Sequence, residues 1–362
     1  MNALERDLVD FAQRLAATPS LPGEERKVAE LVATMLVHLG YRDVAVDPVS
    51  NVVGYLGEGS PRLMFNGHLD HVPPAGMEDP YGAQIVDGHL RGRGTLDMKA
   101  NVAAGAFAAA FVGAPLRGTY LFTADVREEI DGPEGIQALL AQGLRADYGV
   151  SGEATSLDVA LGHRGKVQID VTVAGRSSHA ATPAEGENAV FRALPFLAAL
   201  ERAGERLPSD PLLGAATLTV TGIASAPPGG VAVVPSSCTI RVDRRYVRGE
   251  TPDSCRVDVE ELIDRVAAEH GAHATVELVN VYPLMATEPD HPLVRAASAA
   301  VEDATRRVPA LKAWRFGVNA TFMNAAGIPS VGIGRATSVS RTLPPSASRS
   351  ARSSRPATPT RT

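Results

Sequence analysis

The spacing of apolar residues divides the chain into alternating predicted helices and strands. Near the N-terminus the apolar positions recur every three or four residues, which predicts amphipathic helices over about 4–17 and 24–39. Apolar runs then predict strands near 43–46, 51–55, 63–65 and 118–125, with an Ala-rich helix over 101–111 before the last of them. Strands that alternate with helices are typical of an α/β sheet, so we expect an α/β fold.

The pattern changes at Lys166, where KVQIDVTVA alternates apolar and polar residues and predicts a half-exposed strand. The patterns that follow predict the order βαββαβ: a helix, two strands, a second helix and a last strand, over about 188–203, 216–225, 237–246, 254–270 and 275–281. This order indicates a small two-layer, ferredoxin-like domain of residues 165–282, inserted into the first. We expect residues 1–164 and 283–334 to form one α/β domain with a mixed sheet, which includes a helix over about 291–306 and an apolar strand over 328–334.

Length and composition exclude several classes of protein. The chain has 362 residues, enough for about two domains, and its net charge of −6 gives no reason to expect a nucleic-acid partner. Two cysteines are too few for a disulfide framework and do not match a zinc–thiolate site. The N-terminal residues are polar and acidic, unlike a signal peptide, and no apolar run is long enough to predict a membrane span. A cytoplasmic location is therefore expected by default.

Residues able to bind a metal follow the predicted strands. The strand that starts at Leu63 ends in Gly67-His68-Leu69-Asp70, and alternation along it places His68 and Asp70 on one face. A neutral imidazole can bind a metal ion while a carboxylate two residues on fixes its tautomer. Asp97 comes just before the Ala-rich helix in a glycine-containing loop. Taken alone, these residues also fit a solvated His–Asp pair and an ordinary loop Asp.

Further carboxylates follow later strands, at Glu128-Glu129 and at Glu153. Carboxylates gathered so closely would repel each other unless cations lie among them. Mixed nitrogen and oxygen ligands suit zinc, with cobalt or manganese as alternatives. The alternative for Glu128-Glu129 taken alone is an exposed acidic turn, which is the more common case.

The motifs GHLD, GRGTLDMKA, DVREE and SGEAT occur in one order and spacing that resembles a family of co-catalytic zinc hydrolases. This family includes acetylornithine deacetylase, succinyl-diaminopimelate desuccinylase and carboxypeptidase G. The resemblance extends through GHRGK (162–166) and RSSHAATPAEGENAV (176–190) and covers about residues 8–334. It implies a catalytic domain interrupted by a lid domain that dimerises.

The resemblance also implies a two-metal site. By motif, His68, Asp97 and Glu153 would hold one divalent ion, with Asp97 bridging to a second ion that Glu129 also binds. Two metals that share a water lower its pKa towards neutrality. The resemblance thus implies hydrolysis of an amide bond.

Three further roles follow from the same resemblance. Asp70 would orient His68, and Glu128 would be the general base. His179 in the lid would reach the site of a partner subunit and polarise the substrate carbonyl. The expected partners are a small-molecule amide substrate and a second copy of the chain, with neither nucleic acid nor membrane.

The expected substrate is an amide that carries a carboxylate, such as an N-acyl amino acid or a dipeptide. Arg245 aligns with an arginine that commonly holds such a carboxylate, and a guanidinium suits that task through its bidentate fork. A surface arginine at a strand end is the alternative for Arg245. Asn319 stands where relatives often carry Thr-Asp, and it is our candidate for a further substrate contact. His163 is expected to be a structural histidine at the domain junction.

The chain departs from the family after Gly334. The resemblance implies a late metal-binding His there, in a G-P-G-x-x-x-x-A-H type segment, but no His follows His291, which opens a helix. Residues 335–362 are dominated by Arg, Ser, Thr, Ala and Pro, a composition that predicts disorder.

Three interpretations of this departure stay open: an active hydrolase with a replaced ligand, a non-catalytic relative, and a frameshifted reading of a normal enzyme gene. With GC-rich codons of our choice, residues 335–342 read one base earlier become P-G-D-E-R-L-A-H. That segment would supply the missing histidine at the family's position. On this interpretation the chain as written is a damaged form with weakened metal binding.

Overall fold

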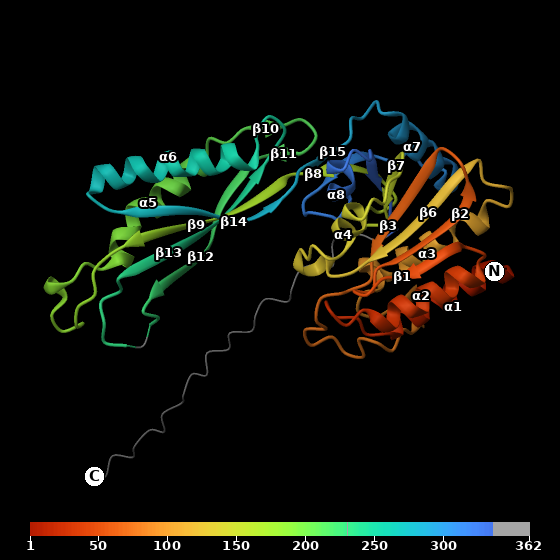
Figure 1. The fold of residues 1–362 in the computed structure, drawn as a ribbon, viewed down its shortest axis with the longest axis horizontal. Helices are drawn as coiled ribbons and strands as arrows, with labels where there is room; N and C mark the ends of the chain where they lie inside the picture. Colours follow the sequence, from red (N-terminus) through yellow and green to blue (C-terminus); the bar gives the residue numbers. More distant parts are fainter. Residues whose placement is uncertain (230, 336–362) are drawn as a thin grey trace, which may run out of the picture.

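The computed structural model describes residues 1–229 and 231–335, and two β-sheets organise this part of the chain (Figure 1). The larger sheet has nine strands in the order β1-β2-β6-β3-β7-β17-β8-β15, with β16 also paired to β8. Its strands are β1 (Arg42–Val46), β2 (Val52–Glu58), β3 (Arg62–His68), β6 (Gly118–Asp125), β7 (Tyr148–Ser151), β8 (Val159–His163), β15 (Met285–Ala286), β16 (Leu311–Trp314) and β17 (Ser330–Gly332).

The larger sheet contains both parallel and antiparallel pairs. β3 runs parallel to both of its neighbours, β6 and β7, and β17 runs parallel to β7. β1, β2 and β6 pair antiparallel, as do β8 and β15. The predicted α/β fold with a large mixed sheet is therefore confirmed.

Helices cover both faces of the larger sheet. Successive residues of a strand point to opposite faces, so neighbouring apolar residues pack against different helices. Phe65 and Phe122 pack with α1, α2 and α3, whereas Met64 and Leu121 pack with α4 and α8 on the other face. α7 packs on β8 and β17. The helices are α1 (Ala3–Ala17), α2 (Arg26–His38), α3 (Ala100–Phe107), α4 (Ile136–Ala141), α7 (Pro292–Thr305) and α8 (Ala320–Ala325).

The smaller sheet is built from the chain between β8 and β15. Its four antiparallel strands lie in the order β12-β13-β9-β14. They are β9 (Gly165–Ala174), β12 (Thr217–Ala226), β13 (Ser237–Tyr246) and β14 (Ala274–Tyr282), and the helices between them are α5 (Ala189–Gly204) and α6 (Pro252–His270). Two short hairpins complete the described strands: β4 (Ile85–Val86) with β5 (His89–Leu90), and β10 (Ser209–Asp210) with β11 (Gly214–Ala215).

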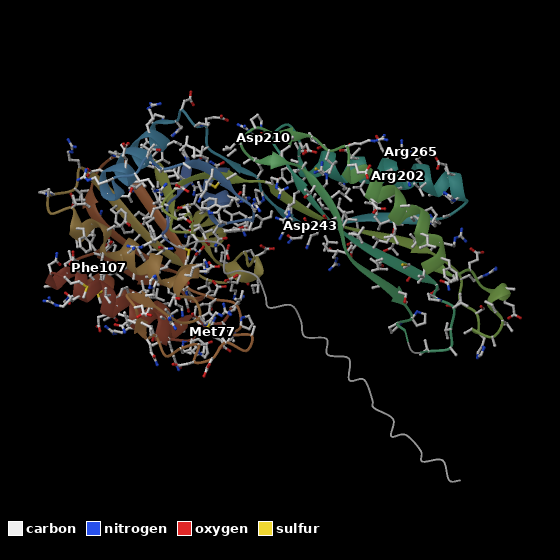
Figure 2. The ribbon with its side chains drawn as sticks, turned by 180° about the vertical axis from the view of Figure 1, so that it is seen from behind. Met77, Phe107, Arg202, Asp210, Asp243 and Arg265 are labelled. Carbon is white, nitrogen blue, oxygen red and sulfur yellow. The ribbon has the colours of Figure 1, made fainter. Side chains whose placement is uncertain are left out.

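The two faces of the smaller sheet differ. Val167, Ile169 and Val171 of β9 are fully buried with residues of α5 and α6. The opposite face of β9 and β13 carries polar residues, and Figure 2 shows Asp243 on that face, away from the two helices. Among the described residues, no helix is long and apolar enough to cross a membrane. The expected disorder of residues 335–362 concerns residues that, apart from Arg335, lie outside the described part of the chain.

Candidate metal centre

The candidate site lies at the carboxyl ends of three adjacent parallel strands. His68 is the last residue of β3, Asp125 ends β6 shortly before Glu128 and Glu129, and Glu153 follows β7. Because β3 pairs in parallel with β6 and β7, these strand ends meet at one edge of the sheet. Asp97 joins them from the turn before α3, where Gly94 has a φ of 77° that favours glycine.

Three of the predicted metal ligands converge. The Nε2 atom of His68 lies 3.1 Å from Oδ1 of Asp97 and 3.5 Å from Oε1 of Glu153. One ligand atom from each residue lies within 4.8 Å of the other two, as required to surround a single ion. His68 and Glu153 are buried, which leaves little water to compete for the ligand atoms. One imidazole nitrogen with two carboxylate oxygens suits zinc and similar divalent ions.

The electrostatics of the cluster also suit a cation. Burial lowers the pKa of the His68 imidazole, but its carboxylate neighbours, Asp70 first, outweigh burial and hold that pKa well above its usual value. Burial raises the pKa of Glu128 well above its usual value, and nearby carboxylates add to the rise against the opposing effect of His68. The cluster therefore favours extra positive charge, which divalent ions would supply.

Two buried carboxylates fix the backbone that carries Glu128 and Glu129. Asp70 accepts hydrogen bonds from the backbone N–H groups of Glu128, at 3.1 Å, and Glu129, at 3.0 Å. Glu25 accepts one from the N–H of Arg127 at 3.1 Å. Three consecutive amides are thus held by side chains from elsewhere in the sequence, at a point where Arg127 has a φ of 58°. Sequence reasoning missed Glu25, because its role depends on a partner 102 residues away.

Asp70 also contacts the imidazole it was predicted to orient. Its Oδ1 atom lies 3.3 Å from Nδ1 of His68, and its backbone carbonyl oxygen lies 3.0 Å from the same nitrogen. Burial raises the pKa of Asp70, but the hydrogen bond and charge of His68 together with the backbone N–H groups of Glu128 and Glu129 outweigh burial, and the net pKa is lowered. Strand alternation is not the reason for this contact, since β3 ends at His68. Instead, the N–H of Leu69 donates a hydrogen bond to the carbonyl of Asp125, and this bond keeps the chain after β3 next to the end of β6.

Comparison with known proteins identifies the family to which this geometry belongs. The model of peptidase family M20/M25/M40 matches residues 64–347. The chain belongs to this family. The family predicted from the motifs is thereby confirmed, and with it a metal-dependent enzyme that hydrolyses amide bonds.

Individual relatives match over most of their length. The chain is 30% identical over 354 residues to the protein YgeY of Escherichia coli (strain K12), covering 91% of this chain and 87% of YgeY. It is 32% identical over 331 residues to a succinyl-diaminopimelate desuccinylase of Phenylobacterium zucineum, with 84% of each chain covered.

Solved structures share the fold. Aminopeptidase PepT of Bacillus cereus superposes with a TM-score of 0.71 at 22% identity, covering 91% of this chain and 90% of PepT. The YXEP protein of Bacillus subtilis, described as a dinuclear metal-binding peptidase of the M20 family, superposes with a TM-score of 0.72 at 16% identity, covering 92% and 89%.

Two other residues expected to act in this M20-type site have side-chain partners outside the cluster of His68, Asp97 and Glu153. The Asn319 side chain is buried, and its Nδ2 donates to Oδ2 of Asp125 at 2.7 Å. Arg245 directs two guanidinium nitrogens at the carboxylate of Asp243, 2.7 and 3.2 Å away. Both arrangements fix the side chains in place, and the roles of Asn319 and Arg245 in binding substrate stay predictions.

His179 is exposed and lies in the segment between β9 and α5, at the end of the smaller sheet far from the larger one (Figure 1). The segment is held by backbone hydrogen bonds, from Ala180 to Ala232 and from Val234 to Ser178. Within one chain, His179 is therefore remote from His68.

His163 has the environment of a structural histidine. It is buried, it accepts a hydrogen bond from the Val318 N–H at Nε2, 3.2 Å away, and its Nδ1 lies 2.8 Å from the carbonyl oxygen of Arg164. Burial lowers its pKa to about 4, so the ring stays neutral near pH 7. These contacts agree with the role expected from the sequence.

The chain beyond β17 starts beside Glu153, one of the candidate metal ligands. The N–H of Gly334 donates to Thr155 Oγ1 at 3.1 Å, and a Cβ at Gly334 would lie 2.3 Å from the carbonyl oxygen of Glu153. Glycine is thus required for this close approach. His291 caps α7 through Nδ1, which accepts the N–H of Leu293, and it is not part of the cluster. A ligand in residues 336–362 would lie outside the described part of the chain.

Proposed function

We propose that this chain hydrolyses the amide bond of an N-acyl amino acid or small peptide, using bound metal ions and a glutamate base. The observation that carries the proposal is the convergence of His68, Asp97 and Glu153 on one point. The segment bearing Glu128 lies next to these ligands, held by Asp70. The similarity to desuccinylases supports an N-acyl amino acid as substrate.

The proposed cofactor is a pair of divalent ions, zinc first, with cobalt or manganese as alternatives. His68, Asp97 and Glu153 would hold one ion, and Asp97 with Glu129 would hold the other. When bound, the ions polarise the scissile carbonyl and lower the pKa of a water molecule.

The chain's own residues supply the proton transfers. Glu128 would take a proton from the attacking water and later give it to the leaving nitrogen, which is why its carboxylate must be placed beside the metal ligands. Asp70 would hold both His68 and the amide of Glu128 in position. Arg245 is the proposed contact for the substrate carboxylate, with Asn319 as a second, and Arg245 offers a fork of donors.

Hydrolysis of the proposed substrates can be tested with a panel of N-acetyl, N-succinyl and dipeptide amides. We expect the purified protein to cleave at least one class, to lose activity when a chelator removes the metal, and to regain it with Zn²⁺. Tight binding of these amides without cleavage, in protein shown to contain two ions per chain, would favour a non-catalytic relative instead.

The larger sheet with its helices, from residues 1–164 and 283–334, is the proposed catalytic domain, and residues 165–282 are the proposed ferredoxin-like lid and dimerisation domain. β12 is an edge strand of the smaller sheet, so its outer backbone groups can pair with another chain. The segment between β9 and α5, which carries His179, lies at the end of the smaller sheet far from the larger sheet (Figure 1), and in the proposed dimer His179 would act at the partner's site. The site would then be complete only in the dimer.

Mixed dimers test whether His179 acts on the partner's site. Neither His179→Ala nor Glu128→Gln subunits should hydrolyse substrate alone, but mixed dimers would contain one site with both groups intact. We expect activity to return to about a quarter of the wild-type value after random exchange of subunits, because half of the dimers are mixed and each has one intact site. Absence of recovery, once exchange is demonstrated by mass spectrometry, would exclude action across the dimer.

A second candidate is a damaged or non-catalytic family member. Its support is the lack of any histidine after His291 in the sequence, although the chain beyond Gly334 starts beside Glu153. A second ion would then have only Asp97 and Glu129 as protein ligands among the predicted set.

A further inference from the structure

The segment that carries Glu128 and Glu129 is linked to the smaller sheet by an ion pair. Asp131 follows the turn Glu128–Ile130, and its Oδ2 atom lies 2.6 Å from Nζ of Lys166. Lys166 is the second residue of β9, where it pairs with Arg245 of β13 and Tyr282 of β14. The pair thus joins the larger sheet's glutamate segment to the smaller sheet's polar face.

The side chain of Lys166 is restrained by burial and by the ring of Tyr282 at the point where it pairs with Asp131. Only 14% of its side chain is exposed, and Nζ lies 5.4 Å from the centroid of the Tyr282 ring. That ring packs edge-on against Phe322, with centroids 5.1 Å apart. A cation held over an aromatic ring has already lost most of its freedom, so its ion pair is stronger than an exposed one between mobile side chains.

Asp125, which precedes the Glu128–Glu129 segment, is also linked to Tyr282, through Asn319. The Oδ2 atom of Asp125 accepts hydrogen bonds from Nδ2 of Asn319, at 2.7 Å, and from the Ile136 N–H, at 3.0 Å. The Tyr282 hydroxyl lies 3.5 Å from Oδ1 of Asn319, to which it donates. Residues 125–131 are therefore held at one end by Asn319 and at the other by Lys166. Both of these residues contact Tyr282, the last residue of β14.

We propose that Lys166 is a positioning residue, which holds the Glu128–Glu129 segment in place through its ion pair with Asp131. Without this ion pair, Asp131 is released and the segment that carries Glu128 and Glu129 loosens. The consequence for catalysis rests on the proposed function, but the effect on the segment does not.

Amide hydrogen exchange of the purified full-length protein measures the mobility of this segment directly. We expect Lys166→Met and Asp131→Asn each to raise exchange in residues 127–133 about tenfold, while β3 and β6 stay protected. The double variant Lys166→Met/Asp131→Asn should exchange no faster than either single variant, because one interaction has been removed. The reversed pair, Lys166→Asp with Asp131→Lys, should restore much of the protection.

Arg241→Met is the matched control. Arg241 pairs with Asp170 at 2.7 Å on the same face of the smaller sheet, so its removal deletes a second, more exposed ion pair of that face without touching Asp131. Exchange in residues 127–133 should not change in this variant. Equal loosening by Arg241→Met, additive effects of the two single changes, or unchanged exchange in both would overturn the proposal.

Kinetics give the second readout. We expect Lys166→Met to lower kcat about tenfold and to change KM less than about threefold, because misplacement of a catalytic group affects the chemical step. If the parent chain hydrolyses no amide of the panel but exchange responds as expected, the proposed function fails while the positioning role stands.

Discussion

Replacing Glu128 with Gln is expected to lower kcat by about 100- to 10,000-fold while the metal content stays unchanged. Glutamine has the same shape, and the backbone N–H of residue 128 keeps its hydrogen bond to Asp70, so the segment should not move. The amide cannot accept the proton of the attacking water. Single-turnover kinetics, with metal analysis and thermal unfolding of the same samples, measure the loss and show whether folding is intact.

Glu129→Gln is the matched comparison for this result. It makes the same chemical change one residue away, where the backbone N–H is held by the other oxygen of Asp70. Because Glu129 is a proposed metal ligand, the substitution Glu129→Gln should reduce the affinity for one ion, and added metal should recover part of the activity. Full hydrolysis by Glu128→Gln would show that the base has been wrongly assigned.

The second large effect is expected from rebuilding the segment after Gly334. If residues 335–342 are replaced by Pro-Gly-Asp-Glu-Arg-Leu-Ala-His, the chain gains a histidine in a segment that starts beside Glu153. If the chain is the damaged form of the second candidate, we expect metal content to rise from about one to about two ions per chain, because the second ion gains a nitrogen ligand. Its affinity should increase by at least about 10- to 100-fold. Isothermal titration with Zn²⁺ and hydrolysis of the amide panel measure the gain.

The same replacement with Ala in place of the final His separates the ligand from the rest of the segment. This control should keep any gain in stability but bind the second ion no better than the original chain. Two tightly bound ions and full activity in the chain as it stands would refute the idea that it is damaged. The gene sequence decides independently whether a shifted frame encodes the family's segment.

Sequence patterns located most elements of this fold but missed those without periodicity. The alternation of KVQIDVTVA and the helical spacing over 4–17 agree closely with β9 and α1. β8 was missed because every residue of Val159–His163 is buried, so the strand shows no alternation. β16 and α8 are only 4 and 6 residues long, too short for a pattern to stand out.

In the candidate site, the residues that stand in local motifs were predicted from the sequence, whereas their partners from distant segments were not. His68, Asp97 and Glu153 stand in recognisable motifs next to strand ends, and parallel pairing brings them together. The partners that fix this arrangement, such as Glu25 and Lys166, come from other segments, and no local pattern marks them. Their roles follow from contacts that exist only in the folded chain.

The place of β17 in the larger sheet constrains the order in which the chain can fold. Among the strands of the described residues, Ser330–Gly332 is the last to be synthesised, yet it lies between β7 and β8. While the chain is still emerging from the ribosome, β7 and β8 therefore each present an unpaired edge that cannot be closed by any earlier segment. The sheet can be completed only after residue 332 is free, so we expect the nascent chain to pass through an open form that is prone to aggregation.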